Sequence, residues 1–194
     1  PAAGSPRLLN TLGYYVDYGD DAAFLPAFLA PRTRFRLMEF CEPTEKLSVY
    51  QFTSGSASPS DRTSRKWFTD SLNAADPPVQ IVADNIIALV LLPILPAADR
   101  QAGGYSESSL APDYVYDSTA RKSDPNLNPR HQLPALIRLT MVAMDETSAR
   151  RLGADTLTAI RSAVSTRFLQ ADRYESDLKS LQEELTRLGV RYEV

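Results

Sequence analysis

The sequence predicts an α+β fold in which an antiparallel sheet is covered by one late amphipathic helix. Residues 34–40 and 136–144 alternate as strands do, with successive side chains on opposite faces. Residues 174–188 instead repeat apolar side chains at spacings of four and three, which is typical of an amphipathic helix. Because an apolar stripe needs a partner surface, we expect this helix to pack against the sheet.

The stretch 133–152 carries the strongest strand signal in the chain. One face of the expected strand is wholly apolar: Ile137, Leu139, Met141 and Ala143. The other face mixes polar and apolar side chains: Leu136, Arg138, Thr140, Val142 and Met144. Such a pattern is typical of a well-covered central strand. Asp145 is expected to cap a short helix whose last apolar residue, Leu152, precedes a stop at Gly153.

The N-terminal part of the chain is predicted to contain two strands. Residues 11–18 are rich in β-prone side chains and end at a turn signal, residues 19–21. Residues 22–31, which contain two prolines, are expected to form an irregular packed segment. The second strand covers residues 34–40, which alternate as stated above.

The middle of the chain mixes short elements with two long loops. Residues 43–45 fit a helix start with Thr44 as its cap, but Leu47 and Val49 fit a strand, so both alternatives stay open. Residues 53–64 are low in complexity and in apolar content, which indicates a flexible loop.

After this loop, residues 67–68 are expected in a short helix or turn. A strand signal covers 79–95, and residues 84–85 in its middle predict a bulge, a bend or two short strands. Residues 96–129 are rich in proline, serine and acidic side chains and are predicted to form a long loop.

The end of the chain is predicted to be a helix followed by a strand. Residues 155–169 have a mixed pattern that favours no element. Asp172 and Glu175 resemble a capping box at the start of the late helix, and Gly189 marks its end. Residues 190–194 then alternate as a final strand.

Composition limits what the protein binds. The chain has 194 residues, 43% of them hydrophobic, which suits one globular domain spanning residues 1–194. The net charge of −3 and the pI near 5.2 leave no basic surplus, so nucleic acid and anionic membrane surfaces are disfavoured partners. Cys41 and His131 are the sole cysteine and histidine, which excludes an internal disulfide and leaves too few ligands for a Cys/His zinc site.

The start of the chain predicts a trimmed or processed product. It begins at Pro1 with neither an initiator methionine nor a signal peptide. The most apolar run, residues 86–95, contains Pro93 and is too short to span a bilayer as a helix.

The acidic residues offer one candidate metal site. Asp17, Asp20 and Asp21 could present carboxylates to a calcium ion, which takes roughly six to eight oxygen ligands. A solvated acidic turn explains the same residues and is the favoured interpretation. Residues 124–128 imitate the first half of an EF-hand loop, but the turn glycine and the bidentate glutamate that should follow are absent.

No catalytic motif is present, and we expect neither enzyme activity nor a cofactor. His131 lies in a loop rich in proline and asparagine, and no Gly-x-Ser-x-Gly elbow accompanies it. Cys41 has apolar neighbours and is interpreted as a small core residue. Asp145 and Glu146 resemble a carboxylate pair, but capping of a helix explains both.

Three blocks of sequence resemble a known family. They are LGYYVDYGD at 12–20, RFRLMEF at 34–40 with PTE at 43–45, and HQLPALIRLTMVAMDE at 131–146. Two further segments stand along the chain in the order expected for that family: VADNIIALVL at 82–91, and YESDL at 174–178, where the late helix starts. Together they resemble the prepilin-like protein C of the Verru_Chthon cassette, a family similar to J-type minor pseudopilins of type II secretion and to PilW-type minor pilins.

The resemblance implies a pilin-like antiparallel sheet domain that assembles with other pilin-like subunits through protein–protein contacts. It implies a precursor with a cleaved leader and about 20 apolar residues ahead of Pro1, which anchor the periplasmic or cell-surface domain in the inner membrane. That anchor helix is missing from the present sequence. The family offers no catalytic residues, so its implied role is structural.

An alternative is an extracytoplasmic binding or hydrolytic domain that uses the acidic loops. This alternative predicts a pocket of converging polar groups around Asp17, Asp20 and Asp21, or around His131. A structural subunit predicts no such pocket.

Overall fold

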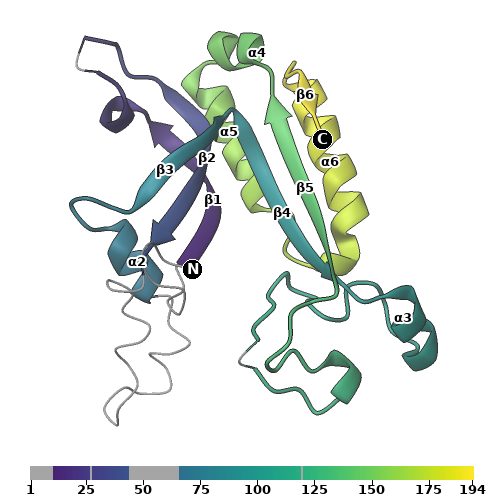
Figure 1. The fold of residues 1–194 in the computed structure, drawn as a ribbon. Coiled ribbons are helices and arrows are strands. Elements are labelled where there is room, and N and C mark those ends of the chain that lie inside the picture. Colours follow the sequence, from purple (N-terminus) through teal and green to yellow (C-terminus); the bar gives the residue numbers. More distant parts are fainter. Residues whose placement is uncertain (1–10, 27, 44–65, 119) are drawn as a thin grey trace. The chain divides into compact units, whose positions relative to one another are not determined.

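A computed structural model describes residues 11–26, 28–43, 66–118 and 120–194. The fold is α+β, with two three-stranded sheets in the orders β1-β2-β3 and β4-β5-β6 (Figure 1). This confirms the predicted α+β class, although the strands form two sheets where one was expected. The chain divides into two compact units: Pro1–Asp17 with Arg36–Asp84, and Tyr18–Phe35 with Asn85–Val194. No helix in the described part of the chain is long and apolar enough to cross a membrane.

The first sheet consists of β1 (Thr11–Asp20), β2 (Thr33–Glu42) and β3 (Val79–Asp84). Strands β2 and β3 are antiparallel, with a bulge between Leu37 and Met38. Helix α2 (Lys66–Leu72) contributes Phe68, whose ring meets that of Phe40 edge-on at 4.9 Å between centroids. Phe40 is fully buried, so this aromatic pair belongs to the core of the first unit.

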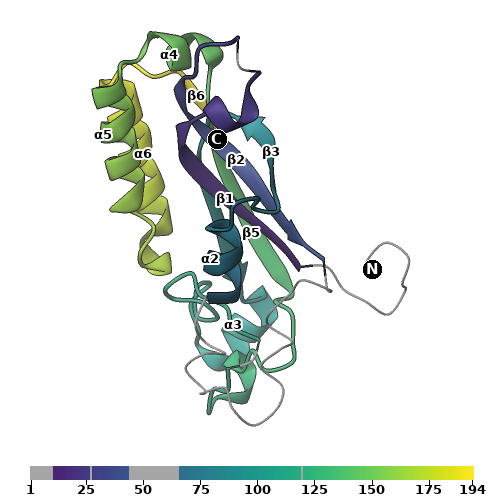
Figure 2. The ribbon, with the colours of Figure 1, turned by 90° about the vertical axis from the view of Figure 1, so that its left-hand side faces the viewer.

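The second sheet is built on a long antiparallel pair. β4 (Ile86–Ile94) pairs with β5 (Leu136–Met144) from Ile86 opposite Ala143 to Ile94 opposite Leu136. The short β6 (Tyr192–Glu193) pairs with the end of β5. The remaining elements of this unit are η1 (Ala22–Phe24), α3 (Ala97–Gly103), η3 (Pro125–Leu127), α4 (Glu146–Arg151), α5 (Ala154–Ser165), η4 (Ala171–Arg173) and α6 (Tyr174–Arg187). Helices α5 and α6 contact each other and run side by side in Figure 2.

The core of the second unit lies between the β4–β5 pair and these two helices. Val90 and Leu92 of β4 form a buried cluster with Ala171 and Tyr174, and Leu178 packs against it. Further along α6, Leu181 and Leu185 are fully buried. The apolar stripe of the late helix is therefore buried, and its first turn packs on the sheet as predicted.

Several local predictions are confirmed. Asp145 caps α4 by accepting hydrogen bonds from the backbone N–H groups of Thr147 and Ser148, at 2.9 and 3.1 Å. Gly189 follows α6 with a φ of 70°, the left-handed conformation that commonly ends helices. The strand signal at 79–95 becomes two strands in different sheets, and Asn85 separates them.

Other predictions are wrong in detail. Strand β1 continues through Asp20, so the expected turn starts later. Gly153 is not left-handed and precedes α5 as its N-cap residue. Asp172 does not cap α6, because η4 leads directly into the helix and makes Arg173 the N-cap residue.

The long loops hold more structure than expected. Helix α3 lies within the predicted loop 96–129, and helix α5 occupies most of the unassigned stretch 155–169. The final strand is limited to Tyr192 and Glu193. The flexible loop predicted at 53–64 and the alternatives for Thr44, Leu47 and Val49 lie outside the described residues.

Candidate interaction surface

The wholly apolar face of β5 is exposed, contrary to the prediction of a well-covered strand. Leu139, Ile137 and Met141 are 62%, 56% and 39% exposed. Leu91 lies opposite Leu139 on β4 and is 45% exposed. Paired residues in an antiparallel ladder project to the same side. These four side chains therefore form one apolar surface, which we call the open sheet face.

The mixed face of β5 is covered instead, because its polar groups have partners there. Thr140 is buried, and its hydroxyl lies 2.5 Å from the Tyr174 hydroxyl. The guanidinium of Arg138 lies 5.0 Å from the centre of the Tyr174 ring and donates to Glu107 at 2.6 Å. With these polar atoms satisfied, α6 can pack on this face, and the opposite face is left without a helix from the second unit.

The size of the open sheet face suits a single helix. Residues 137–141 of one strand span about 14 Å, and two neighbouring strands lie about 4.8 Å apart. An α-helix with its side chains is about 10 Å across. The exposed side chains present only carbon and sulfur atoms, so this surface can bind apolar groups and offers no group for catalysis.

The predicted calcium ligands are engaged with other groups. Asp17 accepts from Arg36 at 2.5 Å, within the first unit. In the second unit, Asp21 forms an ion pair with Arg34 at 3.1 Å, and Asp20 accepts from the backbone of Ala22 at 2.6 Å. Among the described residues no group of three or more His, Cys, Asp or Glu side chains could hold a metal ion.

The remaining candidates also have local structural roles. His131 is exposed, has a φ of 58° and donates its backbone N–H to Ser118 at 2.9 Å, which ties the loop before β5. Cys41 is a half-buried free thiol at the end of β2. In the 124–128 segment, Asp124 accepts from the backbone of Asn126, a turn contact rather than part of a cation loop.

Asn85 and Glu146 form a hydrogen-bonded polar pair at the start of α4. Asn85 has a φ of 62°, and its side-chain amide donates to Glu146 at 2.7 Å. Arg150 donates to the same carboxylate at 2.6 Å. These two hydrogen bonds, that from Asn85 first, lower the pKa of Glu146.

A cavity of about 410 Å³ lies beside this group and is lined by arginines from two segments: Arg32 and Arg34 at the start of β2, and Arg150 on α4. The sequence interpretation missed it, because residues 32–34 and 146–150 are far apart in the chain. In the sequence, the closely spaced arginines at 32 and 34 were the feature that could have indicated this cavity.

Comparisons with protein-family models, curated proteins and solved structures find no match to this chain.

Proposed function

We propose that this chain is the folded domain of a minor pilin- or pseudopilin-like subunit, which acts through protein–protein contacts in a secretion or pilus-like assembly. The open sheet face is the observation that carries the proposal. Monomeric proteins seldom expose large continuous apolar patches, and those that do use them for interaction. The family resemblance supplies the expected occupant, which is an apolar helix encoded ahead of Pro1.

Covering this face would stabilise the assembled protein. Burying a leucine-sized side chain completely is worth about 1.5–3 kcal/mol, so covering one that is already half-buried contributes about 1 kcal/mol. Four such residues, Leu91, Ile137, Leu139 and Met141, would together contribute about 3–5 kcal/mol. That is enough to hold a tethered helix in place, since a linked segment pays little further entropy for association.

The proposal places the domain outside the cytoplasm, anchored in the inner membrane by that helix. It needs no cofactor and no catalytic residue. The alternative of an acidic-loop binding or hydrolytic domain has less support, since Asp17 and Asp21 are occupied by arginines.

Assembly of the gene product with its own upstream residues tests the proposal. Leu139→Glu should leave the fold intact, because the side chain is 62% exposed, and should abolish incorporation into the filament or tip complex. Leu169→Glu is the matched control, since Leu169 is 64% exposed and follows Phe168, which packs against the buried cluster on the helix-covered side of the sheet. Equal incorporation of both variants, or an upstream reading frame without an apolar segment, would contradict the proposal.

A further inference from the structure

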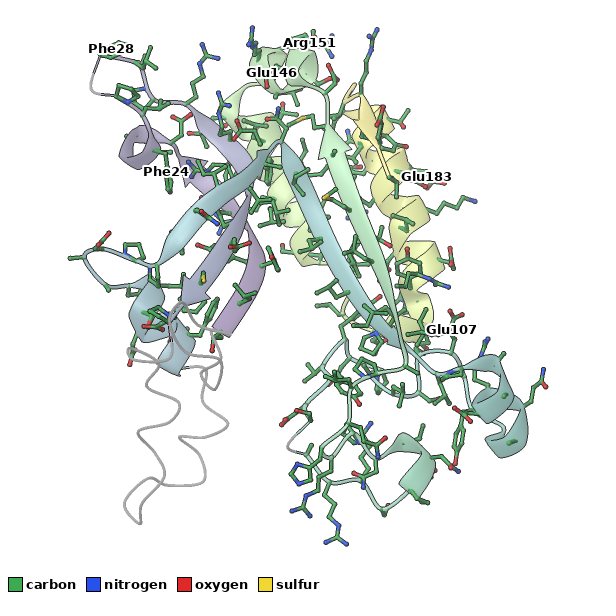
Figure 3. The ribbon with its side chains drawn as sticks, viewed as in Figure 1. Phe24, Phe28, Glu107, Glu146, Arg151 and Glu183 are labelled. Atoms are coloured by element: carbon green, nitrogen blue, oxygen red, sulfur yellow. The ribbon has the colours of Figure 1, made fainter. Side chains whose placement is uncertain are left out.

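The described residues of the segment 22–31, which leave out Ala27, form a loop with exposed large apolar side chains, which we call the apolar loop. None of its ten side chains, AAFLPAFLAP, carries a nitrogen or oxygen atom. We expected this segment to be packed, yet Phe28 is 84% exposed, Leu29 48% and Phe24 42%. Figure 3 shows Phe28 at the outer end of the loop. Exposure of two phenylalanines and a leucine on one short loop requires an explanation in terms of binding.

The base of the apolar loop is held closed by Asp21, which is 5% exposed. The backbone N–H of Asp21 donates to the carbonyl of Arg32 at 3.1 Å, and the N–H of Arg32 donates back to the Asp21 carboxylate at 2.6 Å. The same carboxylate pairs with Arg34 at 3.1 Å. The loop is therefore presented on a fixed base.

Part of the backbone of the apolar loop is hydrogen-bonded locally. Phe24, Leu25 and Leu29 donate their N–H groups to carbonyls three residues back, at 3.0–3.3 Å. Pro26 and Pro31 have no N–H to satisfy. These three donors keep their partners when the loop enters a less polar medium, and the prolines have no donor to lose, so both features lower the cost of inserting the loop.

The cavity lined by Arg32, Arg34 and Arg150, which we call the arginine cavity, adjoins the base of the apolar loop. Its lining contains three arginines, Arg32, Arg34 and Arg150, against the single carboxylate of Glu146. Arg34 is paired with Asp21 and Arg150 with Glu146, while the exposed Arg32 has no ion pair among the described residues. At roughly 30 Å³ for each water molecule, about 410 Å³ has room for a headgroup-sized anion.

We propose that the apolar loop inserts into the interfacial layer of an anionic lipid membrane, with Arg32 at the arginine cavity binding headgroup phosphates. A ten-residue loop closed at its base reaches at most about 16 Å, and interfacial elements insert by about 5–10 Å. Stable membrane binding needs two signals, and here an apolar loop is joined to a cationic site. The net charge of −3 averages over the whole chain and does not describe this end of it.

Vesicle flotation of the 194-residue chain tests this proposal. Binding is expected to vesicles of phosphatidylcholine with phosphatidylglycerol and to be much weaker on phosphatidylcholine alone. Phe28→Asp should lower the partition coefficient about tenfold or more, since it removes a buried aromatic side chain from the bound state. Arg32→Gln should lower binding to the anionic vesicles and leave binding to the neutral ones unchanged.

Leu133→Asp is the matched control, because Leu133 is 88% exposed and lies outside the loop. It should bind as the wild type does. Absence of vesicle binding would overturn the proposal and indicate a protein partner for the loop. A Phe28→Asp variant that binds normally would also overturn it. So would a Leu133→Asp variant that loses as much binding as Phe28→Asp. Vesicle binding does not involve the open sheet face, so the membrane proposal can fail while the proposed function holds.

Discussion

Leu91 and Leu139 lie opposite each other on the β4–β5 ladder, and both side chains point away from the helices that cover the sheet. Scattered exposed leucines are normal on protein surfaces, but a paired row across two strands is not. The same two strands bury Val90 and Thr140 on their other side. The sheet therefore has one face committed to the core and one face available to a partner.

The α6 stripe should be essential for folding. Leu181→Asp places a carboxylate at a position with 0% exposure, and we expect a loss of more than about 4 kcal/mol in the free energy of unfolding. Urea denaturation measures this loss. Leu169→Asp, at 64% exposure, should change stability by less than about 0.5 kcal/mol. A stable Leu181→Asp variant would show that the stripe is not core.

Two tyrosines should respond in opposite ways to loss of their hydroxyl groups. The Tyr114 hydroxyl is buried and has no hydrogen-bond partner among the described residues, and burial raises its pKa to about 12. Tyr114→Phe should therefore be neutral or stabilising by up to about 1 kcal/mol.

Tyr174→Phe removes the partner of the buried Thr140 hydroxyl and should cost about 1–3 kcal/mol. Thermal unfolding of both variants gives the comparison. A larger loss for Tyr114→Phe than for Tyr174→Phe would contradict the assignment of partners.

At position 85, glycine should leave the protein more stable than alanine does. Both substitutions lose the hydrogen bond to Glu146, but the φ of 62° costs alanine about 1 kcal/mol that glycine avoids. Ala88 is the control, because it lies within β4 with no such φ, and there glycine should be the less stable choice. The same order at both positions would argue against backbone strain at Asn85.

Glu146 should make stability depend on pH in the acidic range. Its pKa is lower in the folded chain than the ordinary value of 4.5, because Asn85 and then Arg150 stabilise the carboxylate. The stabilisation is therefore complete above pH 4.5 and is lost as the pH falls through the lowered folded-state pKa. Glu146→Gln should flatten the fall in melting temperature between about pH 5 and pH 3. An unchanged pH profile would show that other carboxylates account for it.

The strands and helix ends could be predicted because their signals are local. Alternation defined β2 and β5, and Asp145 and Gly189 marked helix boundaries through their own chemistry. Helix α5 was missed because its buried side chains, Leu157, Ile160 and Ala163, recur only every third residue among polar ones. That three-residue repeat was the feature of the sequence that could have indicated helix α5.

The choice of buried face could not be predicted, because it depends on partners distant in sequence. Arg138 and Thr140 make one face of β5 look the more polar, yet Glu107 and Tyr174 satisfy both residues there. Likewise the apolar composition of residues 22–31 predicted packing, whereas Asp21 holds the loop closed and exposed. Composition identified these segments as important but did not say which side faced solvent.

Thiol labelling at position 139 tests the central claim most directly. Leu139→Cys in a Cys41→Ala background is compared between the 194-residue chain and the product that carries its upstream residues, with Leu169→Cys as the control. The open sheet face predicts rapid maleimide labelling of position 139 in the 194-residue chain and labelling at least about tenfold slower once a helix covers it, with position 169 equally fast in both. Equally rapid labelling of position 139 in both proteins would contradict the account.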